Sequence, residues 1–158
     1  MTSEVEIAVE RFASGLSCSQ AVFSAFAPNL GIPNDTALKL ASAFGGGVAR
    51  RGEVRGAVTG ALMALGLARG HVTTDEAGKE ATYRLANAFA DQFASRHGSL
   101  RCQELIGSLL STPEGMQSAR DRAVFTEICP KLVGDAADIV ATLLQKNAGP
   151  AAGDGSSQ

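Results

Sequence analysis

The sequence predicts an all-α fold, an irregular or orthogonal bundle of about seven helices around one central apolar helix. Apolar residues recur with the spacing of amphipathic helices along the whole chain, and no segment alternates as a strand does. Aromatic residues make up only 5% of the composition while glycine reaches 18 residues, which favours closely spaced helices packed through small side chains. At 158 residues, the chain can form one domain with a substantial core.

Three helices are expected in the N-terminal third of the chain. The first begins near residue 5 and ends at Gly15, and its apolar side chains follow the i, i+3, i+4, i+7 spacing. Ser17 is the expected N-cap of the second helix, which extends to about residue 27. Asn34 or Asp35 is the expected cap of the third. Its predicted inner face consists of Ala37, Leu40, Ala41 and Phe44.

The central helix is expected over residues 56–68, after a glycine-rich break at residues 45–52. Its side chains are apolar on nearly all sides, which is typical of a helix that other helices surround. Gly60 and Gly66 each cost about 1 kcal/mol of helix propensity relative to alanine. We expect both glycines to permit close approach of a neighbouring helix.

Four more helices are expected in the C-terminal half. A capping box at residues 73–76 opens the longest helix, which extends to about residue 96. A short helix follows at about residues 100–106, another at residues 113–128 capped by Thr112, and the last begins at Pro130. The inner face of the longest helix is predicted to be Ala77, Ala81, Leu85, Ala88, Phe89, Gln92 and Phe93. Residues 1–146 are therefore one predicted domain, and residues 147–158, rich in Gly, Ala and Ser, a predicted disordered tail.

Composition argues against two classes of partner. The net charge of −2 and the pI near 5.7 lack the basic surplus of nucleic-acid-binding proteins. Residues 1–10 contain three glutamates and no apolar signal segment, and the longest apolar stretch is too short to span a bilayer. We therefore expect a cytoplasmic protein with no nucleic-acid or membrane partner. Its alanine- and glycine-rich helix surfaces are compatible with a homodimer.

The chain has three cysteines, and each is predicted near the start of a helix. Cys18 follows the cap Ser17, Cys102 follows Ser99 within one turn, and Cys129 precedes Pro130 as a cap would. The partial positive charge of a helix N-terminus favours thiolate over thiol. This placement predicts a site for thiol redox chemistry or metal binding. The alternative is that each cysteine is a small buried hydrophobic residue.

The glycine-rich segment at residues 45–60 contains no nucleotide-binding motif. It lacks the Gly-Lys-Ser/Thr end of a phosphate loop, and a helix rather than a strand precedes it. Arg50, Arg51 and Arg55 lie beside a predicted helix N-terminus, which suits a small anion such as phosphate or carboxylate. The alternative is a tight turn with solvent-facing arginines. The chain also lacks Cys-x-x-Cys and Cys-x-x-Cys-His, which excludes exchange between neighbouring thiols of the thioredoxin type and covalent haem attachment.

Five short motifs occur together in this chain. They are Gly15-x-x-Cys18-x-Gln20-Ala21-Val22, Phe44-Gly45-Gly46-Gly47, Gly52-x-x-Arg55-Gly56-Ala57-x-x-Gly60, the isolated Cys102, and Cys129-Pro130. In order and spacing, the chain resembles the redox-active proteins of the C_GCAxxG_C_C family over about residues 4–145. The resemblance implies a small helical protein with four cysteines that acts in redox chemistry or holds a metal or iron–sulfur centre.

This chain departs from the family at one position, because Arg55 stands where the family's Cys-Gly-Ala-x-x-Gly segment begins with cysteine. The resemblance then leaves Cys18, Cys102 and Cys129 as redox thiols or as ligands of zinc or an iron–sulfur cluster, with His97 as a candidate fourth ligand. The charge of Arg55 would lower the pKa of a nearby thiol. A Cys102–Cys129 disulfide is one open pairing.

We therefore expect a redox or metal-binding protein whose site forms where the helices of Cys18, Arg55, Cys102 and Cys129 converge. Its partner would be a redox partner or a small anion. The alternative is a non-catalytic interaction or anion-binding domain that keeps the fold without the chemistry, since one missing ligand often ends a metal site.

Overall fold

The computed structural model describes residues 3–146, and these residues are all-α, as the sequence predicts. They form eight α-helices, a 3-10 helix and a π-helical segment, with no β-sheet in this part of the chain. In order, the elements are α1 (Glu4–Ala13), α2 (Cys18–Phe26), η1 (Ala27–Leu30), α3 (Asn34–Leu40), α4 (Gly56–Arg69), α5 (Glu76–His97), α6 (Cys102–Ile106), α7 (Pro113–Asp121), η2 (Val124–Ile128) and α8 (Cys129–Lys146). The predicted tail at residues 147–158 lies outside the described residues.

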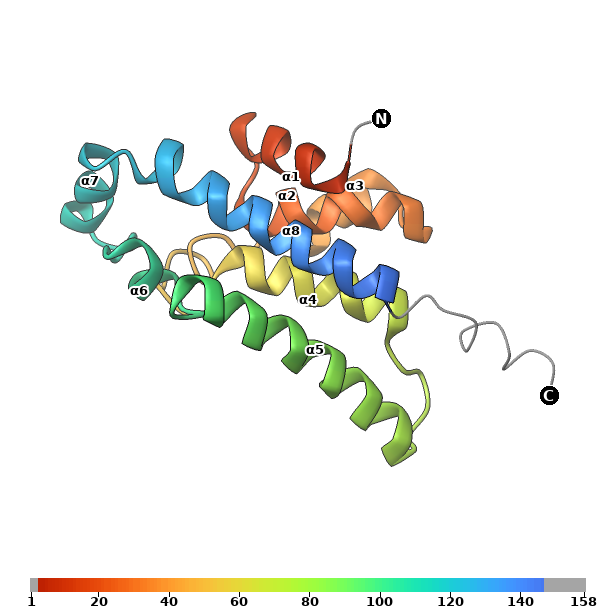
Figure 1. Cartoon of the computed structure of the whole chain (residues 1–158). Coiled ribbons are helices and arrows are strands. Elements are labelled where there is room, and N and C mark those ends of the chain that lie inside the picture. The colour runs from red at the N-terminus through yellow and green to blue at the C-terminus, as the bar shows by residue number, and fades with distance from the viewer. Residues whose placement is uncertain (1–2, 147–158) are drawn as a thin grey trace.

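Helix α4 is the centre of the bundle, as its apolar sequence predicts. It contacts α2, α5 and α8, and Figure 1 shows it between the green α5 and the orange and blue helices. The buried residues form one hydrophobic core to which α2, α4 and α8 contribute most. None of the helices in the described residues is long and apolar enough to cross a membrane.

Gly60 allows α4 and α2 to touch through their backbones. A Cβ atom at Gly60 would lie 2.6 Å from the carbonyl oxygen of Ser19, closer than any real contact. Gly66, one and a half turns further along α4, has no neighbouring atom within 4 Å of such a Cβ. The expected close approach is therefore present at Gly60 and absent at Gly66.

Several helix starts differ from the sequence prediction, including that of α6, where Arg101 rather than Ser99 is the N-cap and forms no side-chain cap bond. Pro33, rather than Asn34 or Asp35, is the cap of α3 and forms no side-chain cap bond, so the fixed φ of proline sets this start. Asp75 caps α5 by accepting a hydrogen bond from the N–H of Gly78, in place of the predicted capping box.

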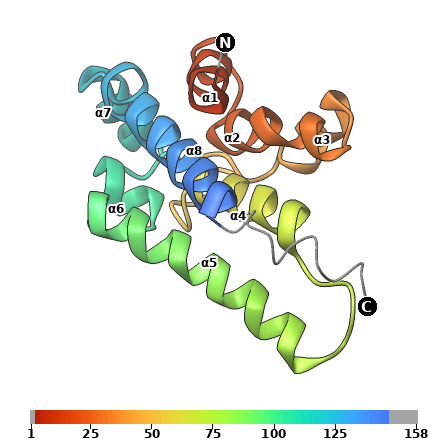
Figure 2. The same cartoon turned by 45° about the vertical axis from the view of Figure 1, so that its right-hand side comes forward.

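The predicted inner faces of α3 and α5 are only partly buried. Leu40 is 53% exposed because it lies at the last turn of a short helix, beyond the cover of α2. Ala77 and Ala81 are exposed because the first half of α5 extends away from the other helices, as Figure 2 shows. The second half is inserted in the core through Phe89 and Phe93, both fully buried.

The predicted helix at residues 113–128 is interrupted. Ala123 has a φ of 54°, in the left-handed region, which ends α7 and redirects the chain into the π-helical η2. The residues of η2 lead directly into α8, which begins at Cys129 rather than Pro130. Periodicity alone does not predict this break, since apolar residues continue through it.

The two α4 glycines provide a matched test of this packing. Gly60→Ala should lower the free energy of unfolding by about 2 kcal/mol, because the methyl group would force apart two backbones that cannot yield. Gly66→Ala should raise it by about 1 kcal/mol, because only helix propensity changes at this exposed position. Chemical denaturation of both variants measures the two effects, and equal changes would contradict the proposed contact.

Candidate functional site

The side chain of Arg55 lies at the centre of the cysteine cluster. Arg55 is the residue before α4 and is only 1% exposed. Its guanidinium donates from Nη2 to the Sγ atom of Cys18 at 2.9 Å and from Nη1 to the Sγ atom of Cys102 at 3.1 Å. One planar cation thus joins the start of α2 to the start of α6.

Cys129 completes the cluster from α8. Its thiol lies close enough to the side chains of Cys18 and Arg55 for both to shift its pKa. The three cysteines are buried, at 6%, 1% and 1% exposure for Cys18, Cys102 and Cys129, and all three are free thiols. The predicted convergence of the four residues is therefore present in the structure.

A short backbone pairing places Arg55 and Cys102 beside each other. Val54 and Arg101 form an isolated antiparallel bridge. On either side of it, the N–H of Arg55 donates to Leu100 O at 2.8 Å and the N–H of Cys102 donates to Glu53 O at 2.7 Å. Because both segments are held at the backbone, the positions of Arg55 and Cys102 do not depend on side-chain contacts alone.

The glycine-rich segment turns with left-handed backbone geometry next to the cluster. Five consecutive residues, 46–50, have φ between 49° and 74°, and three of them are not glycine. Gly47 is required here, since a Cβ at this position would lie 2.8 Å from the Cβ of Cys102. Left-handed geometry costs about 1–2 kcal/mol for each non-glycine residue, so this segment stores strain beside the site.

Hydrogen bonding and charge separate the pKa values of the thiols. The hydrogen bond from Cys18 lowers the pKa of Cys129, and the charge of Arg55 lowers it further against the effect of burial, to about 6. The same hydrogen bond, together with burial, raises the pKa of Cys18 well above its ordinary value. Burial raises the pKa of Cys102 more than Arg55 lowers it. The cluster at neutral pH therefore holds one thiolate, on Cys129, and two thiols.

Arg55 remains charged in this environment. Burial lowers the pKa of the Arg55 guanidinium, but the neighbouring sulfur charges outweigh that effect and raise it above its ordinary value. The charges of the Cys129 thiolate and the Arg55 guanidinium therefore offset each other within the cluster.

The partial positive charge of helix N-termini contributes less to stabilising a thiolate at this site than the sequence analysis predicts. Cys18 is the first residue of α2, behind a complete capping box formed by Ser17 and Gln20. Cys102 begins a helix of only five residues. The N–H of Cys129 donates to Val124 O of the π-helical η2, so it is not a free helix start. The guanidinium, rather than the end of a helix, is the principal positive charge at the thiolate.

A cavity of about 1040 Å³ opens beside the cluster. Cys18, Cys129 and Arg55 line it, whereas Cys102 does not. Arg50 and Arg120 also line it, while Arg51 is exposed and lies outside the lining. The role of Arg120 has no sequence signal, because its position in α7 resembles that of any exposed helical arginine.

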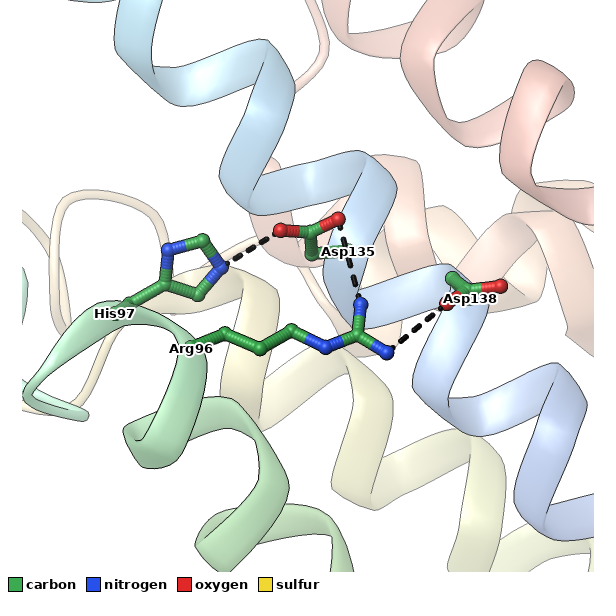
Figure 3. A network of polar contacts seen from close by, with 4 residues as sticks. All are labelled: Arg96, His97, Asp135 and Asp138. Carbon is green, nitrogen blue, oxygen red and sulfur yellow. Dashed lines mark hydrogen bonds and ion pairs between the residues drawn. The ribbon is translucent and has the colours of Figure 1, made fainter.

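His97 belongs to a different network, which joins the end of α5 to α8. Figure 3 shows His97 and Arg96 facing two aspartates of α8. The Nε2 atom of His97 lies 2.9 Å from Asp135 Oδ2, and Arg96 pairs with Asp135 at 3.4 Å and with Asp138 at 3.2 Å. The His97 ring also lies 4.7 Å from the ring of Phe93, measured between centroids.

The arrangement around Arg55 does not fit a metal or iron–sulfur centre held by the cysteines. Such a centre needs sulfur lone pairs directed at a shared cation, and here the Cys18 and Cys102 sulfurs accept hydrogen bonds from the guanidinium. A metal ion would add a second cation beside a buried one. In the described part of the chain, no group of three or more His, Cys, Asp or Glu side chains is arranged to hold a metal ion.

The comparisons with known proteins identify the family. Residues 16–143, which include the whole site, match the family model described as "Putative redox-active protein (C_GCAxxG_C_C)". The chain belongs to this family. No curated protein and no solved structure matches the chain. The resemblance seen in the motifs is therefore confirmed at the level of the family.

Removing the charge of Arg55 should change the pH dependence of Cys129. In the wild type, the rate of Cys129 alkylation by iodoacetamide should rise through a pKa of about 6. Arg55→Gln should move this midpoint upward and slow alkylation at pH 5 about tenfold for each pKa unit of the shift, because below the midpoint one pKa unit is a factor of 10 in thiolate fraction. Peptide mass spectrometry of timed reactions measures the rate at each cysteine.

Two further variants make this test specific. Arg51→Gln removes an equivalent charge outside the cavity and should leave the profile unchanged. Arg55→Lys keeps the charge and should keep most of the shift. An unaltered midpoint in folded Arg55→Gln would show that the guanidinium does not stabilise the thiolate.

Proposed function

We propose that this protein is a thiol–disulfide redox protein in which Cys129 is the nucleophile and Cys18 is the resolving thiol. The observation that carries the proposal is that Cys18 and Cys129 line the same cavity together with the buried guanidinium of Arg55, which donates a hydrogen bond to the Cys18 sulfur. Membership of a family described as redox-active supports it.

The reaction is a two-electron exchange with a disulfide substrate. The Cys129 thiolate attacks one sulfur of the substrate, which forms a mixed disulfide and releases the other half as a thiolate. The Cys18 thiol then loses its proton to this leaving thiolate and attacks the Cys129 sulfur, which forms the Cys18–Cys129 disulfide and releases the second half. The protein dithiol is oxidised, and the substrate disulfide is reduced to one thiol and one thiolate, which takes a proton from water.

The remaining residues of the cluster position and polarise this pair. Arg55 stabilises the Cys129 thiolate before attack and contacts the Cys18 sulfur throughout. Cys102 accepts the second guanidinium hydrogen bond and lies away from the cavity, so it is a positioning residue for Arg55. A thiolate with a pKa below ambient pH is present at neutral pH yet remains nucleophilic, as the exchange requires.

Serine variants assign the three cysteines. After incubation with oxidised glutathione, the wild type should lose two titratable thiols and become two hydrogens lighter, with Cys18 linked to Cys129. Cys129→Ser should lose none at a comparable rate. Cys18→Ser should accumulate a stable mixed disulfide on Cys129, because no resolving thiol remains. Cys102→Ser should still form the disulfide.

Intact-mass and peptide-mass spectrometry distinguish these products. A disulfide between Cys102 and Cys129, or equal reactivity of all three serine variants, would contradict the assignment. Thiols of ordinary reactivity in the wild type would favour the alternative of a domain that keeps the fold without the chemistry.

The metal content of the purified protein tests whether Arg55 prevents the cysteines from binding a metal. Protein purified without oxygen and without a metal-binding tag should contain no stoichiometric iron, zinc or acid-labile sulfide, because a guanidinium stands among the sulfurs. Arg55→Cys restores the four-cysteine pattern and should bind zinc more tightly than the wild type. Elemental analysis and competition with a zinc chelator measure both. Stoichiometric metal in the wild type would overturn the dithiol mechanism.

A further inference from the structure

The cavity beside Cys129 combines an apolar wall with a cationic one. Its larger apolar side chains come from α1, from the loop before α2, from the region between α6 and α8, and from the start of α8: Phe12, Leu16, Leu110, Met116, Phe125 and Pro130. Its charged side chains are Arg50, Arg55 and Arg120, and no aspartate or glutamate among the described residues lines it. A cavity of this composition suits a molecule that is partly apolar and negatively charged.

Two of these arginines carry charge that no carboxylate offsets. Among the described residues, Arg50 and Arg120 form no ion pair, whereas Arg96 and Arg101 each pair with acidic side chains. Arg55 is balanced by the Cys129 thiolate, so the cavity as a whole keeps a positive charge in a chain whose net charge is −2. Uncompensated charge of one sign lining a cleft attracts ligands of the opposite sign.

The buried end of the cavity also has an unused hydrogen-bond donor. The Nε atom of Arg55 is buried and has no hydrogen-bond partner in the described part of the chain. A buried donor without a partner is uncommon in a folded protein, because its desolvation is then uncompensated. This second observation concerns the same side chain that contacts Cys18, at the place where a substrate would meet the thiols.

We propose that the cavity binds an organic anion with an apolar body, and that the disulfide reduced at Cys129 belongs to this chemical class, carrying carboxylate groups that Arg50 and Arg120 recognise. The reaction in this inference rests on the proposed function. The preference for an anion rests on the lining of the cavity alone.

Two disulfide probes of similar size separate the charge preference from the reactivity. Dithiobis(nitrobenzoate) is an aromatic disulfide with two carboxylates, and dithiodipyridine is an aromatic disulfide without charge. The measurement is the second-order rate constant of each probe with full-length protein that carries Cys102→Ser, followed by the colour of the released thiol at low and high salt. The ratio of anionic to neutral rate constants reports the preference of the cavity.

In the parent protein, this ratio should exceed the ratio for a free cysteine peptide and should fall with salt. Arg120→Gln, on an exposed helix surface, should lower it about threefold, and Arg50→Gln with Arg120→Gln should lower it about tenfold, since each exposed charge contributes somewhat under 1 kcal/mol at several ångströms. The rate with the neutral probe should not change. Arg51→Gln, which removes a neighbouring charge outside the cavity, should leave both rates unchanged.

The outcomes for the two proposals differ. A fast neutral probe with a ratio that neither arginine substitution lowers would overturn the anion preference and leave the redox proposal intact. A neutral probe that reacts no faster than a free cysteine would overturn the redox proposal, and the ratio would still decide the charge preference. An equal fall in the ratio for Arg51→Gln would show a general surface effect and would also overturn the assignment to this cavity.

Discussion

The buried guanidinium of Arg55 is the constraint on which the rest of the site depends. Transfer of an arginine to the protein interior is strongly unfavourable unless hydrogen bonds and an opposite charge compensate it. Here two sulfurs accept from it at 2.9 and 3.1 Å, and a third supplies the negative charge. Because these sulfurs come from α2, α6 and α8, removal of any one leaves the cation less compensated. Folding of the bundle and ionisation of Cys129 are therefore coupled.

Contacts with neighbouring residues hold the backbone before Arg55 in a conformation that several of its own residues disfavour. Residues 46–50 turn with left-handed geometry that three of them disfavour, and the bridge between Val54 and Arg101 fixes the next segment. Strain of this kind persists only where surrounding contacts determine it. The contact of Gly47 with Cys102 and the backbone bonds to residues 52–55 are those contacts. These contacts hold the charged side chain of Arg55 in the interior.

The sequence predicts the features of this protein that local chemistry determines. Apolar spacing locates the helices, and the apolar α4 is central because every face of it must be covered. The cysteine motifs contain residues that the fold brings together around Arg55. Leu40, the first half of α5 and the break at Ala123 differ from prediction because tertiary packing, not spacing, decides burial and chain direction there. Arg120 joins the cavity only through the fold, since nothing in its local sequence distinguishes it from any other exposed helical arginine.

The arginine at position 55 changes the electrostatics of the site as well as its ligands. Four thiolates around a metal would make a strongly anionic centre, which repels anionic molecules. One thiolate paired with one guanidinium is neutral, so the charges of Arg50 and Arg120 determine the field of the cavity. Arginine in place of the family's cysteine at position 55 thus alters both the metal-binding capacity and the charge of the site. In the proposed mechanism, the arginine supplies the cation that favours the Cys129 thiolate, and an anionic disulfide approaches this thiolate through the cavity lined by Arg50 and Arg120.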